Sequence, residues 1–172
     1  MKRYIFSDQA EDRELARLRL VEAAFDPKTQ AWLGTAGVGA GKKCLEIAAG
    51  AGSIAKWMSE RCGEVGGVTA VDLATRYLSG LTPQVRVIEG DATSVDLGGP
   101  YEVAHCRYML IHNPNAQTVV DRVRGALATG STFCLKSRTS RLPGHLVPSR
   151  ISASRRRLVT GSSLRVLIPA LA

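Results

Sequence analysis

The residues best suited to chemistry lie in one short stretch that combines an acid with small residues. Glu46 lies in an apolar run, and Ala48, Gly50 and Gly52 follow it at alternate positions. After Ser53 the apolar positions change to helical spacing, so the stretch predicts a buried strand, a tight turn and a helix. Such a turn lets a ligand approach the backbone closely and meet the first N–H groups of the helix.

Two classes of adenosine-containing ligand use a turn of this kind. A dinucleotide is bound through the pattern G-x-G-x-x-G/A, which Gly50, Gly52 and Ala55 fit. S-adenosylmethionine is bound through an acid on the strand and small residues at alternate positions, which Glu46, Ala48 and Gly50 fit. The turn alone does not decide between these two ligands.

Three acidic residues bear on that choice. Asp72 ends the second predicted strand, where a carboxylate can accept both hydroxyls of a ribose in either ligand. Glu46 could face the positive amino group of a methionyl moiety, since a carboxylate in an apolar strand is costly unless it is paired. Asp91 follows the third predicted strand, where it could accept the adenine amino group while the N–H of Ala92 meets a ring nitrogen. A dinucleotide gains little from Glu46 or Asp91.

Each acid also has a plainer explanation. Asp72 could be a surface acid at the end of a strand, and Glu46 could be satisfied by neighbouring backbone or by a lysine. Asp91 could simply cap a turn.

The elements that would position these residues alternate between strand and helix. We predict strands at Lys43–Ala48, Gly67–Asp72, Val85–Ile88, Tyr101–Cys106 and Thr132–Leu135, and helices at Ser53–Cys62, at Thr75–Gly80 and after Asn113-Pro114. Alternation of this kind predicts an α/β fold: a doubly wound, mostly parallel, Rossmann-like sheet with helices on both faces.

We expect a helical cap over residues 1–38, before a ligand-binding domain over residues 39–136. Apolar positions at helical spacing between Leu15 and Phe25 predict an amphipathic helix over Gln9–Phe25. Asp26-Pro27 then resembles a second helix start, so a separate short helix should follow. These helices could form a lid over the site, or they could be plain packing elements.

Together these residues resemble the class I S-adenosylmethionine-dependent methyltransferases over about Lys43 to Leu135. The resemblance rests on Leu45–Ser53, Val71-Asp72 and Gly90-Asp91-Ala92, and on Tyr101–His112, which is similar to the family's fourth strand and its loop. It implies a domain that binds S-adenosylmethionine and returns S-adenosylhomocysteine. By this resemblance the cofactor site is lined by Glu46, Ala48, Gly50, Gly52, Asp72, Asp91, Ala92 and Arg107.

The chain departs from the family pattern in three places. Ala48 stands at the first glycine of the family's G-x-G-x-G, where its methyl group is either tolerated or crowds the methionyl part of the cofactor. Glu102 stands where Asp is usual on the fourth strand. After Lys136 the composition changes, whereas the family's sheet continues with a helix and an antiparallel pair of strands.

The net charge of +8 belongs to the end of the chain. Residues 137–172 hold seven of the 23 Lys and Arg and none of the 15 Asp and Glu, so residues 1–136 are close to neutral. We therefore expect no basic surface on the folded part of the chain, and no nucleic-acid partner for that part. The segment itself predicts a basic, irregular tail, an arm for RNA or acidic lipid, or an ending foreign to the family. Without further strands, strand five would be an exposed edge.

The sequence identifies neither the methyl acceptor nor a definite catalytic residue. Methyl transfer needs a general base only if the acceptor must lose a proton. His112 lies near the ligand-binding end of the fourth strand and is the candidate base, whereas His105 lies within that strand. We expect a small-molecule acceptor, because motifs of nucleic-acid methylation are missing. The alternatives are a truncated, non-catalytic remnant of such an enzyme and an NAD(P)-dependent oxidoreductase.

Other features of the sequence predict a cytoplasmic protein. No apolar run approaches the length of a membrane span, and the N-terminal apolar segment is too short for a signal peptide. The four cysteines show no metal-binding spacing, so we expect buried thiols and no metal. The sequence gives no indication of the oligomeric state.

Overall fold

The computed structural model describes residues 5–110, 113–136, 158–160 and 164–167. Its elements in chain order are α1 (Ile5–Thr35), β1 (Lys43–Ile47), α2 (Ser53–Cys62), β2 (Gly67–Asp72), η1 (Thr75–Tyr77), β3 (Val85–Glu89), β4 (Tyr101–Arg107), α3 (Ala116–Gly125), β5 (Leu127–Lys136), β6 (Leu158–Thr160) and β7 (Leu164–Leu167). Where the sequence predicts a helix from Thr75 to Gly80, the structure has the single 3₁₀ turn η1. None of the described helices has the length and apolar character needed to cross a membrane.

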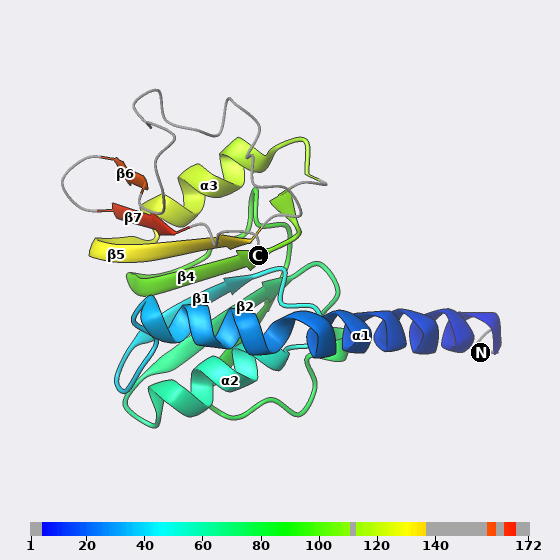
Figure 1. Ribbon diagram of the computed structural model, residues 1–172. Coiled ribbons are helices and arrows are strands. Elements are labelled where there is room, and N and C mark those ends of the chain that lie inside the picture. The colour runs from blue at the N-terminus through cyan, green and yellow to red at the C-terminus, as the bar shows by residue number, and fades with distance from the viewer. Residues whose placement is uncertain (1–4, 111–112, 137–157, 161–163, 168–172) are drawn as a thin grey trace.

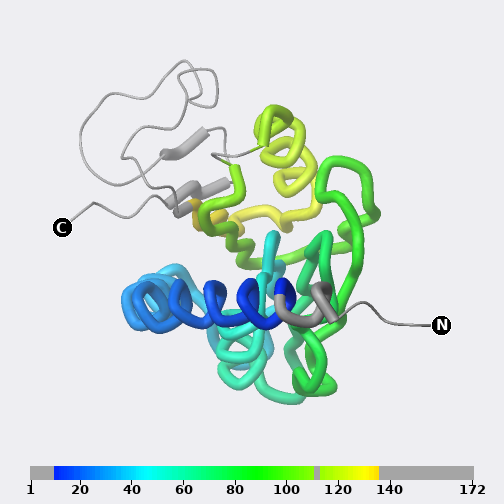
Figure 2. The backbone as a smooth tube through the Cα atoms, turned by 90° about the vertical axis from the view of Figure 1, so that its right-hand side faces the viewer, coloured from blue at the N-terminus to red at the C-terminus, as the bar shows by residue number. Residues whose placement is uncertain are grey.

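Strands β1 to β5 form the parallel, doubly wound sheet that the sequence predicts. The strand order is β3-β2-β1-β4-β5-β7-β6, so β1 lies between β2 and β4. Helices α1 and α2 lie on one face of the sheet and α3 lies on the other (Figures 1 and 2). The chain winds outward in one direction from β1 and in the other from β4. Their carboxyl ends therefore meet at the switch point where such sheets bind ligands.

Alternating side chains of β1 divide the core between the two faces. Leu45 and Ile47 pack into the core beneath α3. Cys44 packs into a second core with α2 and with Leu33 near the end of α1. Because side chains alternate along a strand, Glu46 lies on the same side as Cys44. The acid of the glycine-rich stretch is therefore held beneath α1.

The predicted helix break at Asp26-Pro27 is wrong, because α1 is a single helix with Pro27 in its interior. Proline lacks the N–H that an interior helical position needs. The helix continues because buried residues on both sides of Pro27 share one face that packs onto the domain: Glu22, Asp26, Thr29 and Leu33. This face is mainly polar, whereas the predicted apolar face leaves Phe25 36% exposed.

The segment after Lys136 contributes two strands to the sheet. Strand β7 pairs in parallel with β5, and β6 pairs antiparallel with β7. Strand five would be an exposed edge only without further strands, and that condition is not met because β7 pairs with it; these seven residues of the tail are regular. The other residues of 137–172 lie outside the described part of the chain, so the irregular tail predicted there stays a prediction.

Replacing Pro27 with Ala should raise the free energy of unfolding by about 1–3 kcal/mol. The side chain of residue 27 is exposed, so the substitution restores a backbone donor without disturbing the core. Urea unfolding of the full chain measures the effect. Lys28→Ala, at the neighbouring exposed position, is the matched control and should change stability little. A destabilised Pro27→Ala variant would contradict a continuous helix.

Candidate functional site

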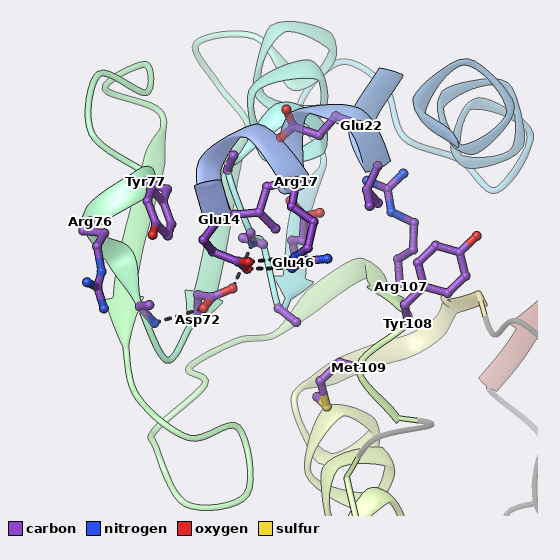
Figure 3. Close-up of a pocket in the computed structure, with 17 residues that line it drawn as sticks. Glu14, Arg17, Glu22, Glu46, Asp72, Arg76, Tyr77, Arg107, Tyr108 and Met109 are labelled. Atoms are coloured by element: carbon purple, nitrogen blue, oxygen red, sulfur yellow. Dashed lines mark hydrogen bonds and ion pairs between the residues drawn. The ribbon is translucent and has the colours of Figure 1, made fainter. Parts of the chain in front are cut away.

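A cavity of about 420 Å³ lies at the carboxyl ends of β1, β2 and β4. Four segments line it (Figure 3): Glu14, Arg17, Leu18, Val21 and Glu22 from α1; Glu46 and Ala48–Ala51 from β1 and its turn; Asp72, Ala74, Arg76 and Tyr77 from the end of β2 and the segment after it; and Arg107, Tyr108 and Met109 from the end of β4 and the segment after it. Five of the predicted cofactor residues thus come together here: Glu46, Ala48, Gly50, Asp72 and Arg107. The cavity lies where the fold predicts a ligand site.

The turn after β1 has the backbone shape that its small residues predict. Ala48, Gly50 and Gly52 have φ angles of 59°, 63° and 85°, in the left-handed region. The N–H of Ala48 donates to the carbonyl of Val71 at 2.8 Å, which fixes the turn to β2. A Cβ at Gly50 would lie 3.3 Å from the Leu18 side chain of α1. The turn is therefore close-packed beneath α1.

Asp72 ties the end of β2 to this turn. Its Oδ2 accepts the N–H of Gly50 at 2.8 Å, and its Oδ1 accepts the N–H of Ala74 at 3.0 Å. Both carboxylate oxygens are thereby oriented at the edge of the cavity. A ribose could engage the lone pairs that remain, because each carboxylate oxygen has more than one acceptor position.

Glu46 is the most unusual group in the cavity, because this acidic residue is only 4% exposed. Its Oε2 has no hydrogen-bond partner among the described residues, and its Oε1 lies 3.5 Å from Nδ1 of His105. Burial raises the pKa of Glu46 well above its ordinary value, although the charge of Arg107 acts in the opposite direction. Ionisation of this carboxyl would therefore be favoured by a cation entering the cavity.

Arg107 both lines the cavity and attaches α1 to the sheet. Its Nη1 donates to Asp26 Oδ1 at 2.8 Å and to Thr29 Oγ1 at 3.2 Å. Arg107 therefore forms a largely buried ion pair whose partner, Asp26, lies on α1. The guanidinium still contributes positive charge to the cavity wall.

Three predicted cofactor residues do not line the cavity. Gly52 caps the start of α2, where a Cβ would lie 2.9 Å from Leu78. Ala92 is buried in the core beneath α3. Asp91 is exposed and accepts the N–H of Thr93 at 2.8 Å, which lowers the pKa of its carboxyl. The adenine contacts assigned to Asp91 and Ala92 stay a prediction.

Two further residues singled out in the sequence are not among the described residues that line the cavity. His112 falls outside the described residues. Glu102 lies at the start of β4, at the opposite end from the cavity, where it pairs with Lys42 Nζ at 2.8 Å and accepts the N–H of Lys43. Glu102, which stands where the family usually has Asp, therefore has no contact with the cavity.

Sequence reasoning did not identify the part of the cavity wall that α1 supplies. The five lining residues of α1 recur at spacings of three and four, as one face of a helix does. Three of the five residues, Glu14, Arg17 and Glu22, are charged, so apolar periodicity does not reveal this face. Glu22 also accepts the N–H of Ser53 at 3.2 Å, and Glu11 pairs with Arg76 at 2.6 Å. These contacts hold α1 over the cavity.

Comparison with known proteins identifies the family. A model of the methyltransferase domain family matches residues 45–135, which is just over half of the chain. This chain belongs to the class I S-adenosylmethionine-dependent methyltransferases. S-adenosylmethionine is the cofactor of this family.

Individual relatives agree with this family. The chain is 29% identical over 130 residues to a ubiquinone biosynthesis O-methyltransferase of Bordetella parapertussis, covering 70% of this chain and 52% of that protein. The chain thus spans about half the length of this curated relative. Among solved structures, an S-adenosylmethionine-dependent methyltransferase from Aquifex aeolicus has a TM-score of 0.59 at 17% identity, covering 79% of this chain and 81% of that one. The N-methyltransferase NodS from Bradyrhizobium japonicum, solved with S-adenosylhomocysteine, has a TM-score of 0.58 at 19% identity, covering 72% and 68%. Both structures share the fold.

Ala48→Gly should raise the free energy of unfolding by about 1 kcal/mol, because a left-handed backbone is strained for alanine and permitted for glycine. Chemical denaturation measures this gain. The matched control is Ala49→Gly at a neighbouring buried residue whose φ is not positive, and it should lose about 0.5–1 kcal/mol. Equal losses in the two variants would show that position 48 is not strained.

Glu46→Gln should stabilise the empty protein increasingly as pH rises. The folded state holds the Glu46 proton at pH values where the unfolded chain has lost it, so wild-type stability falls as pH rises from the unfolded pKa through the raised folded pKa. Gln does not ionise and escapes this decline. Melting temperatures of both proteins between about pH 5 and about pH 8 measure the difference. Glu102→Gln is the control, because the hydrogen bond with Lys42 lowers the pKa of Glu102: this carboxylate is ionised in the folded and the unfolded chain over this pH range, so its replacement should cost a constant amount of stability. Parallel curves for Glu46→Gln and wild type would refute the raised pKa.

Proposed function

We propose that this chain binds S-adenosylmethionine in the cavity and transfers its methyl group to a small-molecule acceptor. The observation that carries the proposal is the Glu46 carboxyl. It is buried, lines the cavity and keeps Oε2 without a hydrogen-bond partner among the described residues. A buried carboxyl in that state matches a ligand with a positive amino group. The cavity volume also lies within the range of small-molecule sites.

Each lining residue has a role that follows from its position. Glu46 receives the amino group of the methionyl part. Asp72 receives the ribose hydroxyls with an orientation fixed by the N–H groups of Gly50 and Ala74. The turn at Gly50 presents backbone without a side chain. Arg107 supplies positive charge for the methionyl carboxylate while Asp26 holds it in place. Asp91 and Ala92 remain the proposed adenine contacts.

The bound cofactor would supply a methyl group on a sulfonium leaving group, so the protein has mainly to align the acceptor. Leu18 and Val21 add apolar side chains to the cavity wall on the α1 side. Tyr108 and Met109, after β4, offer an aromatic and a flexible apolar surface to the acceptor. Among the described lining residues there is no histidine, so His112 stays the candidate base for an acceptor that must lose a proton.

A small-molecule acceptor is favoured by two observations. Residues 1–136 are close to neutral, so the described body of the protein lacks the charge that attracts a nucleic acid. Helix α1 forms one wall of the cavity (Figure 3), which restricts the approach of a large acceptor. The O-methyltransferase of Bordetella parapertussis is consistent with this class of acceptor.

Calorimetric titration with S-adenosylhomocysteine tests the cofactor assignment. We expect Asp72→Ala to weaken binding by about 1–3 kcal/mol, because the ribose hydroxyls lose their acceptor. Asp96→Ala is the matched control, since Asp96 also accepts a backbone N–H, from Gly98 at 2.9 Å, but does not line the cavity. An unchanged affinity of Asp72→Ala would remove the ribose assignment.

Melting curves with and without ligand test the proposal as a whole. A ligand that binds only the folded state raises the melting temperature. S-adenosylhomocysteine should raise it and NAD should not, and an acceptor screen with S-adenosylmethionine then tests turnover. A rise with NAD alone would overturn the proposal. Binding without transfer to any acceptor would leave a cofactor-binding protein in place of an enzyme.

A further inference from the structure

His105 lies directly beside the buried acid of the cavity. The two residues are register partners on the adjacent strands β1 and β4, and Nδ1 of His105 lies 3.5 Å from Oε1 of Glu46. The imidazole is fully buried beneath α1, where the ring of Trp32 meets it edge-on at 6.5 Å between centroids. Position 105 is therefore an interior strand position that holds a polar ring next to the cavity.

Packing alone does not account for an imidazole at this place. The neighbouring buried residues of β4, Val103 and Ala104, are apolar, and a buried polar group is costly unless its polar atoms are engaged. A neutral imidazole can donate one N–H, and a carboxylate can accept through either oxygen. The two oxygens of Glu46 have different surroundings. Oε1 faces Nδ1 of His105, whereas Oε2 has no hydrogen-bond partner among the described residues.

We propose that His105 is a positioning residue for the cofactor. Its Nδ1–H supports Oε1 of Glu46 when that carboxyl is ionised, and this leaves Oε2 for the amino group of the methionyl part. The inference rests on the proposed function. The separation of 3.5 Å is longer than a normal hydrogen bond, as is common before a ligand binds, and the contact shortens when a cation draws the carboxyl into its ionised form.

Two ligands separate this role from a general effect on the fold. S-adenosylhomocysteine carries the amino group, whereas 5′-methylthioadenosine has the same adenosine part and lacks the amino acid. Calorimetry should show that His105→Leu binds S-adenosylhomocysteine about ten- to a hundredfold more weakly than wild type, because a bond to a charged group is lost. The affinity for 5′-methylthioadenosine should stay within about twofold.

Two amide variants test which ring nitrogen acts. His105→Asn places an amide N–H near the position of Nδ1 and should keep most of the affinity for S-adenosylhomocysteine. His105→Gln reaches toward the position of Nε2 and should lose affinity as His105→Leu does. These two variants also keep the proposal testable if His105→Leu does not fold, which a melting curve of each variant reveals.

A double-mutant cycle tests whether His105 acts through Glu46. Adding His105→Leu, or His105→Gln if the leucine variant does not fold, to Glu46→Gln should cause no further loss of S-adenosylhomocysteine affinity, because the carboxylate is already gone.

The pH dependence of binding is a further test. In wild type the affinity for S-adenosylhomocysteine should rise with pH, since the positive amino group of the bound ligand favours ionised Glu46. The other groups that act on Glu46 are Arg107 from β4, Asp26 and Glu22 from α1, and Asp72 from β2. Loss of His105 should move the rise to higher pH, and 5′-methylthioadenosine should show none.

Equal weakening of both ligands would overturn the proposal and leave His105 as a packing residue. A His105→Asn variant as weak as His105→Gln, or additive losses in the cycle, would also overturn it. Failure of the proposed function has a different signature, because wild type itself would then bind neither ligand.

Discussion

The buried carboxyl of Glu46 is the constraint around which the rest of the site is arranged. It lies in the interior strand β1, between β2 and β4, where its neighbours along the strand are Leu45 and Ile47. An ionised carboxyl at such a place needs a cation or hydrogen-bond donors, and burial raises the pKa of Glu46. The fold therefore holds a carboxyl whose burial favours its neutral form and which is suited to a cationic ligand.

Helix α1 completes this arrangement from a distant part of the chain. Its contacts with the domain over the cavity are mainly polar: Asp26 with Arg107 at the end of β4, Glu22 with the start of α2, and Glu11 with Arg76 after β2. Polar contacts of this kind are specific in geometry and modest in net energy. They fix where α1 lies over the cavity, while Leu33 and Thr29 anchor its buried end in the core.

The sequence predicted the parts of the structure that local patterns determine. The strand, turn and helix around Glu46 and the acid at Asp72 follow from residue types within a short window, and the structure places them as predicted. The continuity of α1 through Pro27 and the pairing of β7 with β5 depend on contacts between distant segments, which local propensity does not contain. The contact of His105 with Glu46 could not be predicted for the same reason, because it depends on the register between β1 and β4.

Backbone strain provides an argument for the site that does not depend on the family resemblance. In the described part of the chain, the non-glycine residues with positive φ are Ala48 and Tyr108, at 59° and 62°, and both line the cavity. Strained residues persist only where their surroundings over-determine them, and they cluster at functional sites. Ala48 follows β1 and Tyr108 follows β4, the two strands that carry Glu46 and His105. The strained residues and the buried pair of Glu46 and His105 therefore lie together at the switch point of the sheet. A ligand that binds the Glu46 carboxyl there would offset the free-energy cost of the strain and of the buried pair.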